Sequence, residues 1–181
     1  MNLEGKRIGF VMTGSFCTFR KTIDELKKIV KLGAKVVPIM SENSYTMDTK
    51  FGKAEDFINE IEDITGTKIL HTIQEVEPLG PKDMLDILVV APATGNTMAK
   101  LANDIIDGPA TMAVKSHLRR ERPVVIAVST FIMGGFYHCI ADSFYMFNSL
   151  KLEYITDCKW ITSILGNFIG CNIWRLQRVA N

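Results

Sequence analysis

Hydrophobic residues along the chain fall into short continuous runs, separated by longer segments of helical period. The continuous runs cover residues 6–12, 34–40, 85–91 and 123–128. Apolar runs of this length, rich in β-branched side chains, are typical of strands that are covered on both faces. Pro38 lies inside the second run and has no backbone N–H, which predicts that this strand lies at or near an edge of its sheet.

The segments between the runs predict amphipathic helices. Over residues 19–32 apolar side chains recur at helical spacing, with lysines on the other face and Gly33 as a C-terminal cap; the apolar positions are Phe19, Ile23, Leu26, Ile29, Val30 and Leu32. A second helix is predicted over residues 53–65, with Gly66 after it. Two further helices are predicted over residues 97–103 and 109–120, the last with Pro109 in its first turn.

The remaining segments are polar or rich in turn-forming residues. Residues 41–52 and 77–81 are expected to be loops, residues 92–96 a turn, and residues 68–72 fit a short strand. Strands and helices therefore alternate through residue 130. This order predicts an α/β fold: a three-layer, Rossmann-like, flavodoxin-like parallel sheet with helices on both faces. Such sheets bind ligands beyond the carboxyl ends of their strands.

The first candidate site is the loop after the first strand, formed by Thr13, Gly14 and Ser15. Gly14 permits a tight turn, and the hydroxyl groups precede the N-terminus of a helix, where N–H groups and the helix dipole favour a phosphate. The segment matches neither the dinucleotide-binding fingerprint nor the P-loop. A capped turn without a ligand is the alternative interpretation.

The second candidate site follows the run at residues 85–91 and consists of Pro92, Ala93, Thr94 and Asn96. Small residues allow a planar ring to approach the backbone, and the polar side chains offer hydrogen bonds to a heteroaromatic edge. Asn96 is also a plausible helix N-cap, which needs no ligand.

A third polar position, Ser129, ends the last predicted strand at the same sheet edge. Three polar loops at one edge predict a mononucleotide site. Lys100, one turn further along the helix that follows Asn96, is a candidate for binding a carboxylate, with a solvated lysine as the alternative.

Other reactive side chains give weaker signals. His71, His117 and His138 lie in unrelated contexts and are expected on the surface or as satisfied core residues. Cys17 is expected to be a small buried side chain, although its place near a helix N-terminus could lower the pKa of its thiol. The four cysteines have no C-x-x-C spacing, so we expect free thiols in a reducing cytoplasm and no metal site.

Charge and composition narrow the classes of partner. The 181 residues contain 21 Lys and Arg against 20 Asp and Glu, for a net charge of +1. This balance gives no reason to expect binding to nucleic acid or to an anionic membrane. No apolar run is long enough for a membrane span or a signal-peptide core, so a cytoplasmic location is expected.

Several segments together resemble one family. They are GKRIGFVMTGSFCTF at residues 5–19, EPLGPK at 77–82, residues 85–119, and RPVVIAVST at 122–130. They resemble the family of dipicolinate synthase B subunits, flavoproteins related to FMN-dependent cysteine decarboxylases. The resemblance implies a flavodoxin-like fold, FMN as cofactor, the dipicolinate synthase A subunit as partner, and NAD(P) bound through that partner. It implies formation of dipicolinate from a tetrahydrodipicolinate-type dicarboxylate in the mother cell during sporulation, by a chain that forms homo-oligomers.

Carried over by motif, the resemblance places the FMN phosphate at Thr13, Gly14 and Ser15, and the flavin ring at Pro92, Ala93, Thr94 and Asn96. Two departures stand out. The related decarboxylases use a histidine after the second strand, and residues 41–70 contain none, which disfavours decarboxylation. Position 16 is Phe where the family leads us to expect His. A flavin-dependent decarboxylase and a non-catalytic subunit that binds FMN or serves as a scaffold remain alternative functions.

The C-terminal part departs from the family pattern. Residues 131–181 hold 10 of the 16 aromatic residues and three of the four cysteines, but none of the six prolines. We expect residues 1–181 to form a single flavoprotein-like domain with an atypical end. A frame change or segment replacement in the coding sequence explains the break; an ordinary divergent terminus is the alternative. Translating the other two frames after codon 130 distinguishes them.

Overall fold

The protein is described by a computed structural model over residues 3–129, 150–154 and 173–178, with only the backbone described in the last two segments. Within these described ranges, six strands form one sheet in the order β2-β1-β3-β4-β6-β5. The strands are β1 (Arg7–Met12), β2 (Lys35–Met40), β3 (Ile87–Ala93), β4 (Val124–Val128), β5 (Leu150–Tyr154) and β6 (Ile173–Arg178).

The first four strands are parallel, whereas β6 runs antiparallel to β4 and to β5. The predicted parallel α/β sheet is therefore confirmed, and β2 ends it on one side, as Pro38 predicts. The strand order reverses between β1 and β3, because the chain moves outward to β2 and then returns to the other side of β1. Such a reversal opens a crevice at the carboxyl ends of the two central strands.

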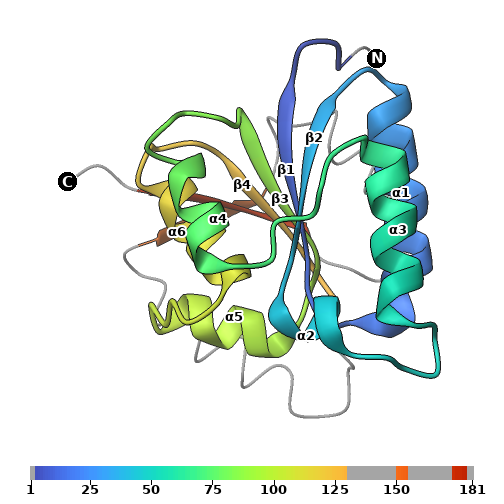
Figure 1. The fold of residues 1–181 in the computed structure, drawn as a ribbon. Helices are drawn as coiled ribbons and strands as arrows, with labels where there is room; N and C mark the ends of the chain where they lie inside the picture. The colour runs from blue at the N-terminus through green and yellow to red at the C-terminus, as the bar shows by residue number, and fades with distance from the viewer. Residues whose placement is uncertain (1–2, 130–149, 155–172, 179–181) are drawn as a thin grey trace.

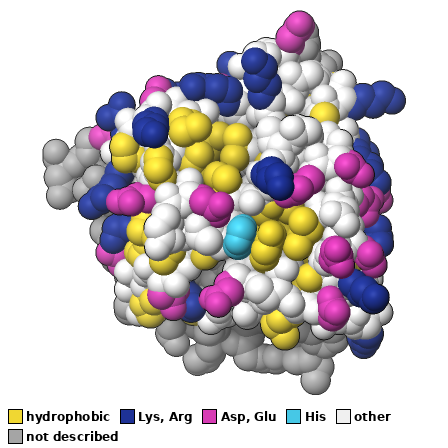
Figure 2. All heavy atoms as spheres, in the orientation of Figure 1, with side chains coloured by type: hydrophobic (Ala, Val, Ile, Leu, Met, Phe, Trp, Pro, Cys, Tyr) yellow, Lys and Arg dark blue, Asp and Glu magenta, His cyan; other side chains and the backbone are white. Residues whose placement is uncertain are grey.

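Helices cover both faces of the sheet (Figure 1). One face carries the long helices α1 (Phe19–Lys31) and α3 (Ala54–Thr65), which lie side by side. The other carries α4 (Ile73–Val76), α5 (Gly95–Ala102) and α6 (Pro109–Leu118). Short turns complete the order: η1 (Phe16–Thr18), α2 (Glu42–Thr46) and η2 (Glu77–Leu79). Charged side chains are spread over the outer surface of both helical layers (Figure 2).

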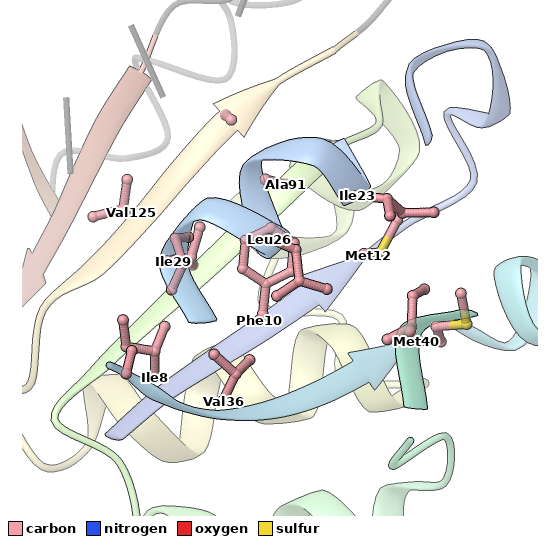
Figure 3. Close-up of a cluster of buried hydrophobic side chains, with 14 of the residues drawn as sticks. Ile8, Phe10, Met12, Ile23, Leu26, Ile29, Val36, Met40, Ala91 and Val125 are labelled. Carbon is pink, nitrogen blue, oxygen red and sulfur yellow. The ribbon is translucent and has the colours of Figure 1, made fainter. Parts of the chain in front are cut away.

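Each face has its own hydrophobic core. On the side of α1 and α3, buried residues of the strands pack against Ile23, Leu26 and Ile29 of α1 (Figure 3). These three residues belong to the apolar stripe that the helical spacing predicts. On the opposite side, the buried residues include Leu88 and Val90 of β3 and residues of α5 and α6. The sheet is thus covered on both faces, which explains its continuous apolar strands.

Several local predictions are wrong. Residues 41–52 contain a short helix, α2, which Ser41 caps by accepting a hydrogen bond from the Ser44 N–H. Residues 68–72 make only a single bridge, between Leu70 and Ile39 of β2. Helix α4 was not predicted, although Thr72 and Glu75 form a capping box whose T-x-x-E spacing is visible in the sequence.

The predicted turn at residues 92–96 is also shorter than expected. Strand β3 continues to Ala93, and α5 begins at Gly95 with Thr94, not Asn96, as its N-cap. The departure of residues 131–181 from the family pattern lies largely outside the described residues. Over the part of the chain that the structure describes, no helix is long and apolar enough to cross a membrane.

Candidate functional site

The loops after β1 and β3 are joined by the side chain of Thr13. Its hydroxyl donates a hydrogen bond to the Pro92 carbonyl at 2.7 Å and accepts one from the Thr94 N–H at 3.0 Å. The Thr13 N–H also donates to the Pro92 carbonyl, at 3.2 Å. Thr13 is only 1 % exposed. Its hydroxyl is therefore occupied by the backbone, and its role is to fix the two candidate loops against each other.

The loop after β4 joins the same edge through Ser129. The Ser15 and Ser129 hydroxyl groups lie 3.0 Å apart, and the Ser129 hydroxyl donates to Thr18 Oγ1 at 3.3 Å. The Ser129 N–H donates to the Ala93 carbonyl at 2.8 Å. The three loops that the sequence singles out are thus in contact, although Ser15 and Ser129 are 114 positions apart.

Two helices present their N-termini at this edge. Thr94 caps α5, because its hydroxyl accepts a hydrogen bond from the Thr97 N–H at 3.2 Å. Gly108 precedes α6 and provides no side-chain cap, and Pro109 occupies the first turn. Since the first N–H groups of a helix have no partner within it, both ends favour a polar or anionic ligand.

These elements enclose a cleft of about 310 Å³. The predicted residues that line it are Thr13, Gly14, Thr94 and Asn96. Lys100, the candidate for binding a carboxylate, also lines it. The remaining lining residues are Ser41, Glu42, Asn43, Thr97, Asp107, Gly108, Pro109, Ala110 and Thr111. The spacing of Ser41 and Ser44 is a helix-start signal that would have pointed to one of these segments. Pro109 already marks the start of a predicted helix, but that helix start was not assigned to the site.

The other predicted site residues lie beside the cleft and do not form its wall. Pro92 and Ala93 are buried in β3, and their carbonyl groups bind Thr13 and the Ser129 N–H. Ser15 and Ser129 form the hydroxyl pair between the first and third loops. The structure therefore separates the predicted set into residues that face the cleft and residues that hold the loops together.

Three charged residues line the cleft in the part of the chain that the structure describes, Glu42, Lys100 and Asp107, and the last two form an ion pair. Lys100 Nζ lies 2.8 and 2.9 Å from the two carboxylate oxygens of Asp107. The hydrogen bond from Lys100 lowers the pKa of Asp107 below its ordinary value, so this carboxylate is ionised at neutral pH. The single lysine among the described residues of the cleft wall is therefore neutralised locally, and the pair ties α5 to the segment that leads into α6.

The remaining candidates lie elsewhere. Cys17 is exposed, so the expectation of a buried side chain is wrong: it lies in the short turn η1, which has no buried residues. His71 stacks on Tyr45 of α2 with ring centroids 3.8 Å apart, and it does not line the cleft. His117 is buried in α6, and no hydrogen-bond partner of its Nε2 is found among the described residues. His138 lies outside the described residues.

Comparison with known proteins gives consistent matches. The model of the Flavoprotein family matches residues 1–149. The dipicolinate synthase B subunit of Bacillus subtilis (strain 168) is 45 % identical over 129 residues, which cover 71 % of this chain and 64 % of that relative. The chain therefore spans less than two thirds of the length of this relative.

Solved structures agree with the fold. The dipicolinate synthase B subunit from Bacillus halodurans C is 44 % identical with a TM-score of 0.64, over 72 % of this chain and 67 % of that one. The FMN-dependent cysteine decarboxylase SpaF has a TM-score of 0.60 at 20 % identity, over 80 % of each chain, and at this identity it supports the fold alone. The strand order, the cleft at the carboxyl ends of β1 and β3, and the family match lead to one conclusion: the chain belongs to the Flavoprotein family.

Proposed function

We propose that the chain binds FMN at the carboxyl edge of the sheet and works as the B subunit of a dipicolinate synthase. The observation that carries this proposal is the 45 % identity to the Bacillus subtilis B subunit, which extends over 129 residues. The geometry supports it because the three loops that the family resemblance assigns to the cofactor are in contact with one another.

The residues at this edge fit a phosphate and a planar ring. A Cβ added at Gly14 would meet only Phe16, at 3.6 Å, and one added at Gly108 would meet nothing within 4 Å, so both glycines border open space. The paired hydroxyl groups of Ser15 and Ser129 and the start of α5 are suitable donors for the phosphate. Thr94 and Asn96, which line the cleft, would border the ring, with Asn96 offering its side-chain amide, and the buried residues Pro92 and Ala93 would support them from β3.

The proposed reaction removes two hydrogens from a dihydropyridine-type dicarboxylate ring to give the aromatic dicarboxylate. FMN supplies an electron acceptor for such chemistry when it is bound, and NAD(P) on the partner, the A subunit, is the alternative acceptor. Within the cleft, the N-termini of α5 and α6 and Lys100 would bind the substrate carboxylates. Lys100 would have to exchange its ion pair with Asp107 for one with the substrate.

That ion pair also favours a second candidate function. Because Asp107 already neutralises the only lysine among the residues that line the cleft, the cleft offers a dianion no unpaired cation in the part of the chain described. A scaffold protein that binds FMN and activates the A subunit, without binding the dicarboxylate itself, needs no such cation.

Flavin binding is tested with two variants of one residue. Ser15→Asp places a negative charge beside the proposed phosphate and should abolish FMN binding, whereas Ser15→Ala removes one hydroxyl and should weaken it by about tenfold. The measurement is quenching of FMN fluorescence on titration with the purified chain. Unchanged affinity in Ser15→Asp would mean that the phosphate lies elsewhere.

The catalytic role is tested by reconstitution with the A subunit. Formation of the aromatic product is followed by its ultraviolet absorbance with and without this chain. We expect product only when both proteins are present. Full activity of the A subunit in the absence of this chain would contradict the proposed catalytic role. If this chain activates the A subunit but bleaches no flavin and binds no dicarboxylate, the result would support the scaffold function.

A further inference from the structure

A second cleft lies at the opposite end of α6 from the candidate site. It measures about 300 Å³, and its lining residues are Glu77, Pro81, Ile106, Met112, Lys115, Ser116, Arg119 and Arg120. Helix α6 has its N-terminus at the first cleft and its last turn at this one, so we call this second feature the α6 groove. The two features share no lining residue in the part of the chain that the structure describes.

The α6 groove is strongly biased toward positive charge. Among the described residues that line it, three are basic and only Glu77 is acidic. Lys115 is paired with Asp104 at 3.1 Å, whereas Arg119 and Arg120 are exposed and form no ion pair with any residue in the described ranges. Within the described ranges, these two guanidinium groups at the rim therefore have no carboxylate partner, and guanidinium groups can bind carboxylates in a bidentate manner.

The interior of the α6 groove is apolar as well as basic. Ile106 and Met112 are half-buried within it, and Pro81 lines it from the turn after η2. The neighbouring Ile105 remains 45 % exposed. Figure 2 shows hydrophobic side chains interspersed with Lys and Arg over the α4 and α6 side of the molecule. Apolar side chains inside, with arginines at the rim, are typical of protein interfaces.

We propose that the α6 groove is the docking site for an acidic amphipathic segment of the partner protein. Such a segment would place aliphatic side chains on Ile106 and Met112 and its Asp or Glu side chains on Arg119 and Arg120. Charge complementarity selects this occupant, because an acidic segment satisfies the two guanidinium groups at the rim and an apolar or basic one does not. The inference rests on the proposed function, which supplies the partner.

Docking at this groove leaves the candidate site open. The end of α6 lies where β4 begins, at the amino edge of the sheet, whereas the first cleft lies at the carboxyl edge. The partner would therefore contact the helix whose first turn lines the cleft without covering the cleft itself.

The test is binding of the full chain to the purified A subunit, measured by isothermal titration calorimetry at low and high salt. The double variant Arg119→Glu/Arg120→Glu should weaken binding by about 10- to 100-fold at low salt, and Arg119→Gln/Arg120→Gln by a smaller factor. The salt dependence of the affinity should decrease in both variants, because fewer charge contacts remain to be screened. FMN binding should not change.

A matched control reverses two lysines on the opposite face. Lys21→Glu/Lys31→Glu changes the net charge by the same amount on α1, and it should alter the affinity for the A subunit less than twofold. Equal weakening by both double variants would show only a general charge effect and would overturn the assignment.

Two other outcomes separate this inference from the proposed function. If the wild-type chain and the arginine variants bind the A subunit equally well, the α6 groove is not the docking site, but the proposed function stands. If the wild-type chain does not bind the A subunit, both fail. Arginine-dependent binding to phosphatidylglycerol vesicles without binding to the A subunit would identify a lipid surface instead and would also overturn the docking proposal.

Discussion

The two faces of the sheet are built from different kinds of side chain. Among the described residues, the core under α1 and α3 contains three fully buried aromatic rings, Phe10, Phe19 and Phe57. The core under α4, α5 and α6 is aliphatic throughout its described buried members, with small residues such as Ala110 and Ala113 on the helix that packs there. Large rings bury more apolar area per residue, so each of these three rings contributes more to stability than a small aliphatic side chain does.

The helices on the two faces also differ in length and in their distance from the cleft. Helices α1 and α3 are 13 and 12 residues long, and side chains of α1 bind Glu60 of α3 in two ion pairs. Helices α5 and α6 are shorter, and the N-termini of both reach the cleft. Small side chains allow these helices to lie close to the sheet, where their first turns can line a site. The aromatic face therefore contributes the large buried rings, and the aliphatic face contributes two helix N-termini to the cleft.

The largest effect should come from the aromatic face. Phe57 is 1 % exposed and packs edge-on against Phe19, with ring centroids 5.2 Å apart. Phe57→Ala should lower the free energy of unfolding by about 3–5 kcal/mol, because it removes a large buried ring and leaves a cavity. Urea denaturation measures this change. Val114→Ala on the aliphatic face is the control and should lower the free energy of unfolding by about 2 kcal/mol. An equal loss of stability in the two variants would show that the aromatic rings do not stabilise the protein more than the aliphatic side chains do.

Acid should destabilise the aliphatic face through His117. Burial lowers the pKa of His117 from 6.5 to about 4, and the nearby charge of Arg122 adds to the effect. Between these values the unfolded chain binds the proton and the folded chain does not, so stability falls as the pH drops from about 6.5 to 4. The difference in pKa corresponds to about 3 kcal/mol.

The measurement compares urea denaturation of the wild type and His117→Asn at neutral pH and near pH 4. The wild type should lose about 3 kcal/mol more than the variant over this range, because acidic side chains contribute equally to both. Identical pH profiles would show that the imidazole of His117 takes up its proton in the folded state without penalty.

Close packing of α6 is tested at Gly80. A Cβ added there would lie 2.2 Å from the Ser116 carbonyl oxygen, which is a backbone atom of α6 and cannot rotate away. Gly80→Ala should therefore cost about 1–3 kcal/mol and displace α6. Gly9→Ala is the control, since its Cβ would meet side-chain atoms of Leu88 and Leu85, which can change rotamer. Urea denaturation that ranks Gly9→Ala as the more damaging variant would contradict this reasoning.

The smallest effect should come from the surface of the aromatic face. Glu60 binds Arg20 at 2.6 Å and Lys27 at 2.9 Å, and both pairs are partly exposed. Glu60→Gln should lower the free energy of unfolding by less than about 1 kcal/mol, and the loss should shrink at high salt. Urea denaturation at low and high salt measures both quantities, and a loss comparable to that of Phe57→Ala would mean that the ion pairs, not the rings, stabilise this face.

The sequence predicts correctly those strands and helices that are long enough to show a hydrophobic pattern. The four parallel strands, the edge position that Pro38 indicates, and helices α1, α3, α5 and α6 follow from hydrophobic periodicity and from the residues that end helices. It missed α2 and α4, because helices of five and four residues are too short to show a period. Their caps, Ser41 with Ser44 and Thr72 with Glu75, were the available signals.

The candidate site was recovered only in part. The sequence pointed to Thr13, Ser15, Thr94 and Ser129 as polar residues at one edge, since parallel strands end together. It could not tell which hydroxyl groups are occupied by backbone partners, because those partners lie 79 to 81 positions away for Thr13. It also left out Asp107, whose contact with Lys100 depends on how the segment between α5 and α6 folds back.

The amino-acid sequence by itself determined the layers, the order of elements and the family, because these follow from local periodicity and from motifs that are contiguous along the chain. Tertiary structure alone decided that Thr13 joins two loops, that Ser15 meets Ser129, and that Lys100 is neutralised by Asp107. The physical reason is the range of the interactions. A helix cap or a strand pattern is set by neighbouring residues, whereas a hydrogen bond across the sheet edge exists only once packing has placed distant segments within about 3 Å of each other.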